Sequence, residues 1–259
     1  MIRSAARNKS LAGQMAAVAL LGLIFAQAVR GAVIASTTFD EGPHLAVGYA
    51  TLRTGDFRLQ PVHIHPPLAN ILAAAPLLLD PSLPDPRTIP GWEIASLSAV
   101  TDTVVWKHSP PDGIAFAGRL PIILLAVLLG AFVFRWAVDL GGRRAGLLAL
   151  FLYALDPNIV AHSQVITTDM GVTVLGFVAL YCYFKYQTSD VKRQTWWLVG
   201  SGAALGAALA TKVTAGLLAP LLAMLILLIG PGASRVASGA LLSWDCWRLS
   251  LCGPCMDLR

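Results

Sequence analysis

One stretch, residues 11–35, limits what this chain can fold into more than any other part. Apart from two glutamines and Arg30 it is apolar throughout, and about 20 such residues are enough for a helix to cross a bilayer. An arginine near the far end of a span can reach the interface with its long side chain. We predict a transmembrane helix here, retained rather than cleaved, because it lacks a convincing small-residue cleavage site.

The composition extends this prediction to the whole chain. Of the 259 residues, 56% are hydrophobic and only 13% are charged, whereas soluble domains carry about 25% charged residues. The net charge of +5 does not indicate a nucleic-acid partner, because the basic residues lie singly or in pairs at the ends of apolar runs, as positive-inside signals do. The chain is therefore expected to be an integral membrane protein.

Further apolar stretches predict five more helices, at residues 119–136, 145–155, 170–186, 196–210 and 216–229. The second of these is short for a full crossing. The predicted fold class is an all-α integral membrane protein, a polytopic helical bundle of about six spans. Its predicted parts are a cytoplasmic N-terminus (1–10), the first transmembrane helix (11–35), a large extracytoplasmic loop with juxtamembrane helices (36–117), a bundle of about five transmembrane helices (118–230) and an atypical C-terminal tail (231–259).

The large loop opens with a predicted helix that ends at Gly55. Asp40 fits as its N-cap, with Glu41 and Pro43 in the first turn, where proline is tolerated. Thr38 and Glu41 also match a capping box, but that register places Pro43 beyond the first turn, so we prefer the Asp40 cap. A second apolar segment at 68–79 is too short to cross a bilayer and is predicted to lie on the surface or to be re-entrant.

The orientation follows from the basic residues. If 68–79 does not cross, the basic clusters after the first span fall on the same side as the N-terminus, and the positive-inside bias makes that side cytoplasmic. These clusters are Arg135, Arg143, Arg144, Lys185, Lys192, Arg193 and Arg235. Eight acidic residues of the loop, together with Asp156 and Asp169, then face outward. The expected location is a bacterial-type plasma membrane, crossed several times.

Adjacent carboxylates, Asp40 and Glu41, follow the first span directly. Neighbouring residues of a helix point in different directions, so one can serve as a general base while the other caps the helix or binds a cation. The alternative is a capped helix start with acids that complement the helix dipole. Asp169 begins another helix on the same outer side. The convergence of two acid-bearing loops favours a functional site.

The histidines of the loop offer a second kind of chemistry. Imidazole and carboxylate groups together suit a divalent cation such as zinc or manganese, and the candidate ligands are Glu41, His63 and His65. No CxxC or HExxH spacing supports this reading, and loop histidines are also commonly solvated or hydrogen-bonded. Alternatively, basic and histidine side chains bind a substrate phosphate at the outer face; the candidates are His44, Arg58, His65 and Lys212.

Several motifs together resemble polytopic glycosyltransferases of the GT-C fold, in the group of protein O-mannosyltransferases and lipid A aminoarabinose transferases (glycosyltransferase family 39-like). They are Phe39-Asp40-Glu41, Gly55-Asp56-Phe57, His65-Pro66-Pro67-Leu68, Thr167-Thr168-Asp169 and the stretch from Gly206 to Lys212. Their order and separations match the N-terminal module of that group over residues 10–230.

The resemblance implies transfer of a hexose or pentose from a polyprenyl-phosphate donor to a protein or lipid hydroxyl at the outer face, with inversion at the anomeric carbon. It gives Asp40 the place of the catalytic acid of the first loop, expected to be the base, and Asp169 that of the second-loop acid. His65 stands where aminoarabinose transferases carry a lysine near the donor phosphate. Ile64 replaces a glutamate of those enzymes, which weakens the case for a metal.

Members of this group are generally much longer than this chain. We therefore expect a truncated copy, and residues 231–259 look like a foreign or out-of-register ending. Cys252 and Cys255 match a thioredoxin-type motif in letters only, because that motif needs an α/β setting. Two other functions stay open: a transporter or lipid-binding membrane protein, and an inactive fragment.

Overall fold

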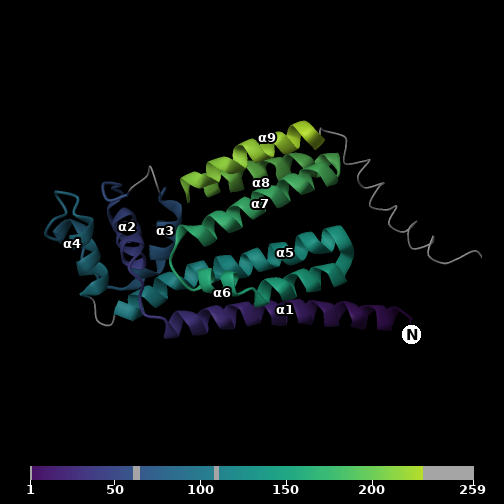
Figure 1. Cartoon of the computed structure of the whole chain (residues 1–259), viewed down its shortest axis with the longest axis horizontal. Helices are drawn as coiled ribbons and strands as arrows, with labels where there is room; N and C mark the ends of the chain where they lie inside the picture. Colours follow the sequence, from purple (N-terminus) through teal and green to yellow (C-terminus); the bar gives the residue numbers. More distant parts are fainter. Residues whose placement is uncertain (1, 61–64, 108–110, 230–259) are drawn as a thin grey trace, which may run out of the picture.

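The computed structural model describes residues 2–60, 65–107 and 111–229, and all regular secondary structure in these ranges is helical (Figure 1). The helices are α1 (Ile2–Ile34), α2 (Glu41–Thr54), α3 (Leu68–Ala74), η1 (Ala75–Leu79), η2 (Pro86–Thr88), α4 (Leu97–Thr101), η3 (Asp102–Trp106), α5 (Pro111–Leu155), α6 (Pro157–Ser163), α7 (Thr168–Thr188), α8 (Val191–Leu209), η4 (Val213–Leu217) and α9 (Leu218–Ile229). The predicted tail at 231–259 lies outside the described residues, as does His63.

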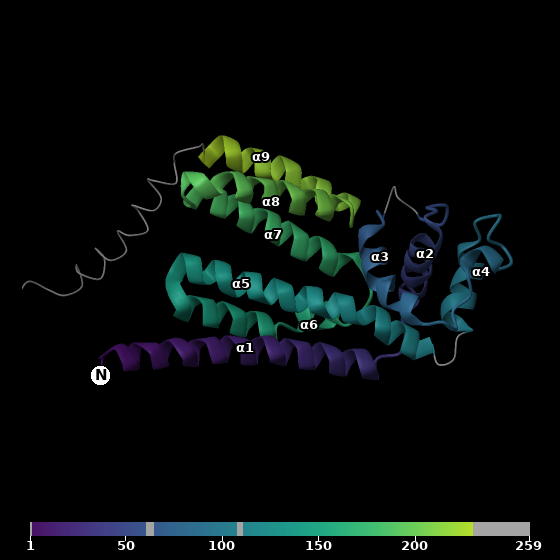
Figure 2. The ribbon, with the colours of Figure 1, turned by 180° about the vertical axis from the view of Figure 1, so that it is seen from behind.

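The molecule has two regions (Figures 1 and 2). The long helices α1, α5, α7, α8 and α9 run roughly along one axis, and the short helices between α1 and α5 form a group at one end of them. The start of α7 also lies at that end. The N-terminus, the bend of α5 and the turn between α7 and α8 lie at the opposite end. The short-helix group therefore lies at one end of a helical bundle.

Helix α5 is a hairpin, because it bends sharply at Gly141 and Gly142. Gly142 has a φ of +75°, a backbone conformation that glycine adopts without steric cost. The legs then run back along each other: the Tyr153 hydroxyl donates a hydrogen bond to the Ala126 carbonyl at 2.8 Å. The stretches predicted as separate helices at 119–136 and 145–155 are the two legs of this hairpin, which begins at Pro111, inside the predicted loop.

Fewer helices qualify as membrane spans than the sequence suggested. By length and composition, two helices of the described residues can cross a bilayer, Leu11–Ile34 and Asp112–Leu155, or three if α6 and α7, bent by 116°, count as one span. The bundle of six spans is therefore not confirmed. Segment 68–79 is a short apolar helix within the end group, where it packs on α2.

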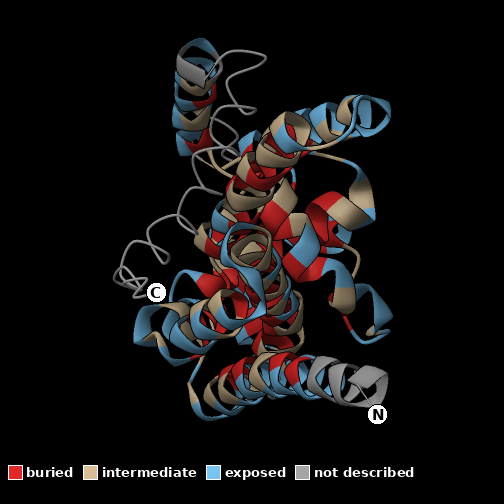
Figure 3. Ribbon diagram, turned by 90° about the vertical axis from the view of Figure 1, so that its right-hand side faces the viewer, coloured by how far each residue is buried: buried red, intermediate tan, exposed pale blue. Residues whose placement is uncertain are grey.

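The surface of the long helices is nevertheless that of a membrane protein. In Figure 3 the buried residues gather where helices face one another, and exposed residues follow their outer sides. Many of these exposed residues are large and apolar; they include Phe25, Leu124, Leu128, Leu148, Leu152 and Leu198. Extended apolar surface of this kind marks contact with a membrane or a partner, and the apolar helices support an integral membrane protein.

Helix α2 begins and ends where the sequence predicts, but its first hydrogen bond is not the expected one. Asp40 occupies the N-cap position, and Gly55, with a φ of +71°, ends the helix. The Asp40 side chain makes no capping bond. Instead the Glu41 carboxylate accepts a hydrogen bond from the Thr38 N–H at 2.8 Å, which is the reach-back bond of a capping box.

Candidate functional site

A cavity of about 320 Å³ lies where the short-helix group meets the bundle. Its volume is within the range of about 300–1,000 Å³ that is usual for small-molecule sites. The starts of α2 and α7, helix α3 and the residues after α8 form its walls. Among the lining residues are Asp40, His44, His65, Thr167, Asp169 and Lys212. Leu97 of α4 also lines the cavity, so five separate segments of the chain converge on one site.

Asp40 lines the cavity with an unengaged carboxylate. It is exposed, it makes no capping bond to α2, and within the part of the chain that the structure describes no ion pair or hydrogen bond involves its side chain. A carboxylate whose lone pairs are not already used can accept a proton from a bound hydroxyl. Asp40 therefore presents to the cavity a carboxylate that is free to accept a hydrogen bond.

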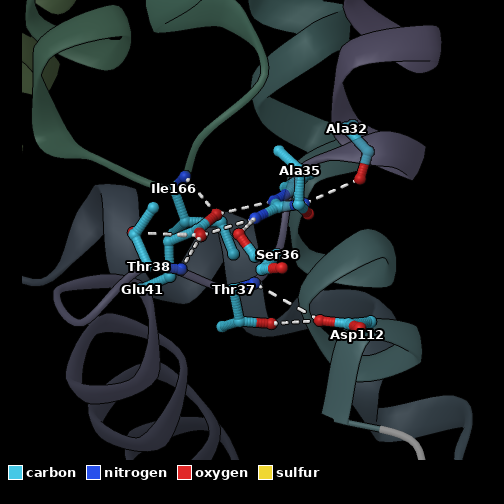
Figure 4. A network of polar contacts seen from close by, with 9 residues as sticks. Ala32, Ala35, Ser36, Thr37, Thr38, Glu41, Asp112 and Ile166 are labelled. Atoms are coloured by element: carbon cyan, nitrogen blue, oxygen red, sulfur yellow. Dashed lines mark hydrogen bonds and ion pairs between the residues drawn. The ribbon is translucent and has the colours of Figure 1, made fainter.

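Glu41 lies next to Asp40 but faces the interior. Both Glu41 and Arg119 have fully buried side chains, and they form a bidentate pair in which Nε and Nη2 of Arg119 each donate to one carboxylate oxygen at 2.7 Å (Figure 4). The same carboxylate accepts the N–H of Ile166 at 3.0 Å. Thr38 adds its N–H at 2.8 Å and its hydroxyl at 3.0 Å.

Arg119 extends this network to the end of α1. Its Nη1 donates to the carbonyls of Ala32 and Ala35 at 2.7 and 2.8 Å, and Nη2 donates to that of Ser36 at 3.0 Å (Figure 4). Burial raises the pKa of Glu41, but the hydrogen bonds of Arg119 and of two backbone N–H groups, with the Arg119 charge, outweigh it, so the pKa lies below its ordinary value. Glu41 is thus an ionised part of the scaffold.

Asp169 and Lys212 form an ion pair in the lining of the cavity. Lys212 Nζ lies 2.5 Å from Asp169 Oδ1, and the two side chains are 25% and 46% exposed. Asp169 comes from the first turn of α7, and Lys212 follows the end of α8. Because both side chains remain partly open, a bound anion can share the lysine charge.

Four polar side chains connect α2 and α3 beside the cavity. His44 Nδ1 is hydrogen-bonded to Asn70 Oδ1 at 2.8 Å, Asn70 donates to Gln60 at 3.3 Å, and Gln60 donates to the His65 carbonyl. The His44 and His65 rings meet edge to face, with centroids 5.5 Å apart. Burial lowers the pKa of His44 below its ordinary value of 6.5; the Asn70 bond opposes this shift, and His65 adds to it.

Arg58, a predicted phosphate-binding residue, lies elsewhere. Its Nε donates to Asp56 at 2.8 Å, and its guanidinium stacks 4.7 Å from the centroid of the Trp92 ring. It is not among the residues that line the cavity. The structure therefore brings His44, His65 and Lys212 together with Asp40 and Asp169, but it does not bring Arg58 to them.

The candidate metal ligands are not assembled either. Among the described residues no group of three or more histidine, cysteine, aspartate or glutamate side chains is placed to hold a metal ion. The Glu41 carboxylate is already occupied by Arg119. His63 lies outside the described residues.

Sequence reasoning missed Arg119, Asn70 and Gln60 as parts of the site. Arg119 was read as the start of a span, although an arginine at the head of an apolar helix is itself a signal for a buried acidic partner. Asn70 lies within the short apolar segment 68–79, and a single polar residue there does not indicate a site. The Glu41–Arg119 and His44–Asn70 contacts each join two separate segments of the chain. The sequence alone does not show which residues of two separate segments will meet.

Comparison with known proteins shows the family of the chain. A search of curated proteins and a search of solved structures found no match. Residues 113–243, half of the chain, match the family described as dolichyl-phosphate-mannose-protein mannosyltransferase. Arg119, Thr167, Asp169 and Lys212 lie inside the matched range, whereas Asp40 lies before it. These proteins are membrane glycosyltransferases of the GT-C type, the group that the motifs resemble, and the chain belongs to this family.

Proposed function

We propose that this protein transfers a sugar from a polyprenyl-phosphate donor to a hydroxyl group at the extracytoplasmic face of the membrane, with inversion. The single observation that carries the proposal is the cavity in which the free Asp40 carboxylate shares a lining with the Lys212–Asp169 pair. The family description, which names dolichyl phosphate mannose and a protein, supports a lipid-linked donor and a protein hydroxyl as acceptor.

The proposed reaction needs a base on one side and an anion site on the other. Asp40 takes the proton of the acceptor hydroxyl as its oxygen attacks the anomeric carbon. The bond between that carbon and the donor phosphate oxygen breaks, and its electron pair stays with the phosphate. A polyprenyl phosphate is already a good leaving group, so the protein chiefly supplies proton removal and charge stabilisation.

Lys212 is the proposed partner of the donor phosphate. Among the lining residues that the structure describes it is the only lysine or arginine. The starts of α2 and α7 border the same cavity, and neither is capped by the side chain at its N-cap position. Helix N-termini favour negative charge, so they add to the lysine charge. His44 lines the same cavity as a hydrogen-bonding group.

Glu41 and Arg119 are proposed as positioning residues rather than as groups that touch substrate. Their pair holds the turn before α2, which carries Asp40, against the segment at Ile166, which leads to Asp169. A base and an anion site on separate elements must be kept at a fixed separation for catalysis. The buried pair provides that fixed separation.

The test uses the purified full chain in detergent or liposomes, a donor with a radiolabelled sugar on polyprenyl phosphate, and a peptide acceptor with serine and threonine. We expect Asp40→Asn to reduce transfer by a factor of about 10² to 10⁴, the usual contribution of a general base. Asp102→Asn is the matched control, since Asp102 is an exposed acid of the same loop that does not line the cavity. It should leave transfer unchanged.

Two results would contradict the proposal. Undiminished transfer by Asp40→Asn removes the assignment of the base. A wild-type protein that binds the donor lipid but transfers nothing to any hydroxyl acceptor indicates a lipid-binding membrane protein instead.

A further inference from the structure

Thr167 precedes α7 in the N-cap position but does not cap it. Its backbone is extended, with φ −137° and ψ 164°, and its side chain accepts no hydrogen bond from the helix. Threonine at this position normally accepts one from the second or third helical N–H. Other N-cap side chains of this chain do so: Asp85, Ser96 and Asp156. Asp190, before α8, also makes none, but it lies at the far end of the bundle.

The Thr167 hydroxyl is also buried without any partner. In the ranges that the structure describes, four buried side-chain polar atoms have no hydrogen-bond partner. Two of these atoms, Thr167 Oγ1 and His65 Nδ1, belong to residues that line the candidate cavity. Buried polar atoms without partners are costly and rare in native proteins, and each requires an explanation, such as a water, an ion or a ligand that satisfies it.

The chemistry of these two atoms differs from that of the rest of the cavity. A threonine hydroxyl both donates and accepts a hydrogen bond, and a histidine nitrogen can do either. Neither has the permanent charge with which Lys212 can bind a phosphate. A sugar hydroxyl, which is uncharged and also donates and accepts, is the complementary group.

We propose that Thr167 and His65 form the subsite that binds the sugar hydroxyls of the donor. This inference rests on the proposed function, because it divides the same cavity between the sugar and the phosphate of one lipid. Both atoms are buried in the structure, so the proposal requires each side chain to turn about its Cα–Cβ bond and present Thr167 Oγ1 or His65 Nδ1 to the sugar, whereas Lys212 binds the phosphate. The two residues then determine how strongly the protein distinguishes a sugar-bearing lipid from the bare lipid phosphate.

The experiment compares two probes on the full chain in detergent, dolichyl phosphate mannose and dolichyl phosphate without sugar. Thr167→Val keeps the shape of the side chain and removes the hydroxyl. It should weaken binding of the sugar-bearing lipid about fivefold, the value of one ordinary hydrogen bond, and leave binding of the bare lipid unchanged. His65→Phe, which keeps a flat ring beside His44, should act in the same direction.

Thr101→Val is the matched control. Thr101 Oγ1 is equally buried and equally without a partner in the described residues, but Thr101 does not line the cavity. We expect its affinity for both lipids to equal that of the wild type. The thermal stability of Thr167→Val without lipid should be unchanged or slightly higher, because no protein hydrogen bond is lost. A change in lipid discrimination with intact stability cannot come from misfolding.

The outcomes separate this inference from the proposed function. The sugar subsite is wrong if Thr167→Val weakens the binding of both lipids equally, or if it weakens the binding of neither. It is also wrong if the wild type binds the two lipids equally. In each case the proposed class of donor still stands. If the wild type binds neither lipid, the donor assignment itself fails, and the subsite fails with it.

Discussion

At the scale of single residues, Asp40 and Glu41 show how two adjacent carboxylates take different roles. Successive residues at a helix start point about 100° apart, so one faces the cavity while the other faces the interior. Asp40 is exposed and unengaged among the residues described. Glu41 accepts hydrogen bonds from Arg119, Thr38 and Ile166. The acid that the sequence paired with Asp40 as catalytic is therefore proposed to position it.

His44 gives a prediction for the pH dependence of stability. Burial holds its pKa below the ordinary 6.5, so the unfolded chain takes up a proton more readily than the folded protein as the pH falls through that value. The contribution of His44 to the free energy of unfolding is present above the pKa that the imidazole has in the unfolded chain. It is lost as the pH falls below that value. Glu41 does not interfere, because its pKa lies below 4.5.

The variant for this test is His44→Gln, which can still hydrogen-bond Asn70 and does not titrate. Thermal unfolding in detergent is followed between pH 7.5 and pH 5.5. We expect the melting temperature of the wild type to fall more steeply over this range than that of the variant. Parallel curves for the two proteins would exclude His44 as the titrating group.

At the scale of helices, the Glu41–Arg119 pair joins four segments of the chain at the end of the bundle that carries the cavity. It links the end of α1, the start of α2, the first leg of α5 and the segment before α7. Glycines let the same elements approach closely. A Cβ on Gly118 would lie 2.4 Å from Leu45 Cδ2, and one on Gly48 would lie 2.0 Å from the Asn70 carbonyl oxygen. One buried ion pair and two close glycine contacts thus contribute, with the apolar core, to holding together the elements that carry the cavity.

Removing one partner of this pair should be strongly destabilising. Arg119→Met leaves the Glu41 charge buried and unpaired, for which we expect a loss of about 3–5 kcal/mol. Arg135→Met is the control: Arg135 pairs with Asp139 at 3.5 Å, its side chain is 61% exposed, and such pairs contribute about 0–1 kcal/mol. The measurement is the unfolding of both variants in detergent, with the double variant Glu41→Leu/Arg119→Met expected to recover part of the loss. Equal effects of the two arginine variants would contradict the role of the pair.

Local signals predicted local structure well. The N-cap at Asp40 and the glycine at Gly55 gave the bounds of α2, and the length of 68–79 correctly excluded a simple span. The Glu41–Arg119 pair could not be predicted, because its partners lie 78 residues apart and no pattern within one segment specifies the other. The two legs of the α5 hairpin were predicted as separate helices at 119–136 and 145–155, and the structure places the bend between them, at Gly141 and Gly142.

The convergence of Asp40 and Asp169 was expected from their common side of the membrane, and the structure brings both to one cavity. Arg58 was expected there because of its charge, but Asp56 and Trp92 satisfy it locally. Charge alone therefore does not place a residue in a site. The roles of these residues remain proposals that the transfer assay decides.

At the scale of the whole molecule, clusters of basic residues lie at one end of the helical bundle and the cavity lies at the other end. The bend of α5 carries Arg143 and Arg144, and the turn between α7 and α8 lies near Lys185, Lys192 and Arg193. Both turns lie at the same end as the N-terminus, and the cavity lies at the other end (Figure 2). Since basic residues are enriched on the cytoplasmic side, we propose that the cavity faces outward.

Cysteine labelling tests this orientation. In a chain whose four native cysteines are replaced by alanine, we introduce Glu93→Cys in the loop or Arg144→Cys at the bend. Both positions are exposed, Glu93 with 88% of its side chain accessible. A membrane-impermeant maleimide should label position 93 in intact cells, and position 144 only after the membrane is permeabilised.

The pair of positions distinguishes two separate errors. Labelling of 144 but not 93 in intact cells would invert the orientation and place the proposed site in the cytoplasm, where a donor presented at the outer face could not reach it. Labelling of both would mean that the first leg of α5 does not cross the membrane at all. Only labelling of 93 alone keeps the unengaged Asp40 carboxylate and the Lys212–Asp169 pair at the face where the proposed transfer occurs.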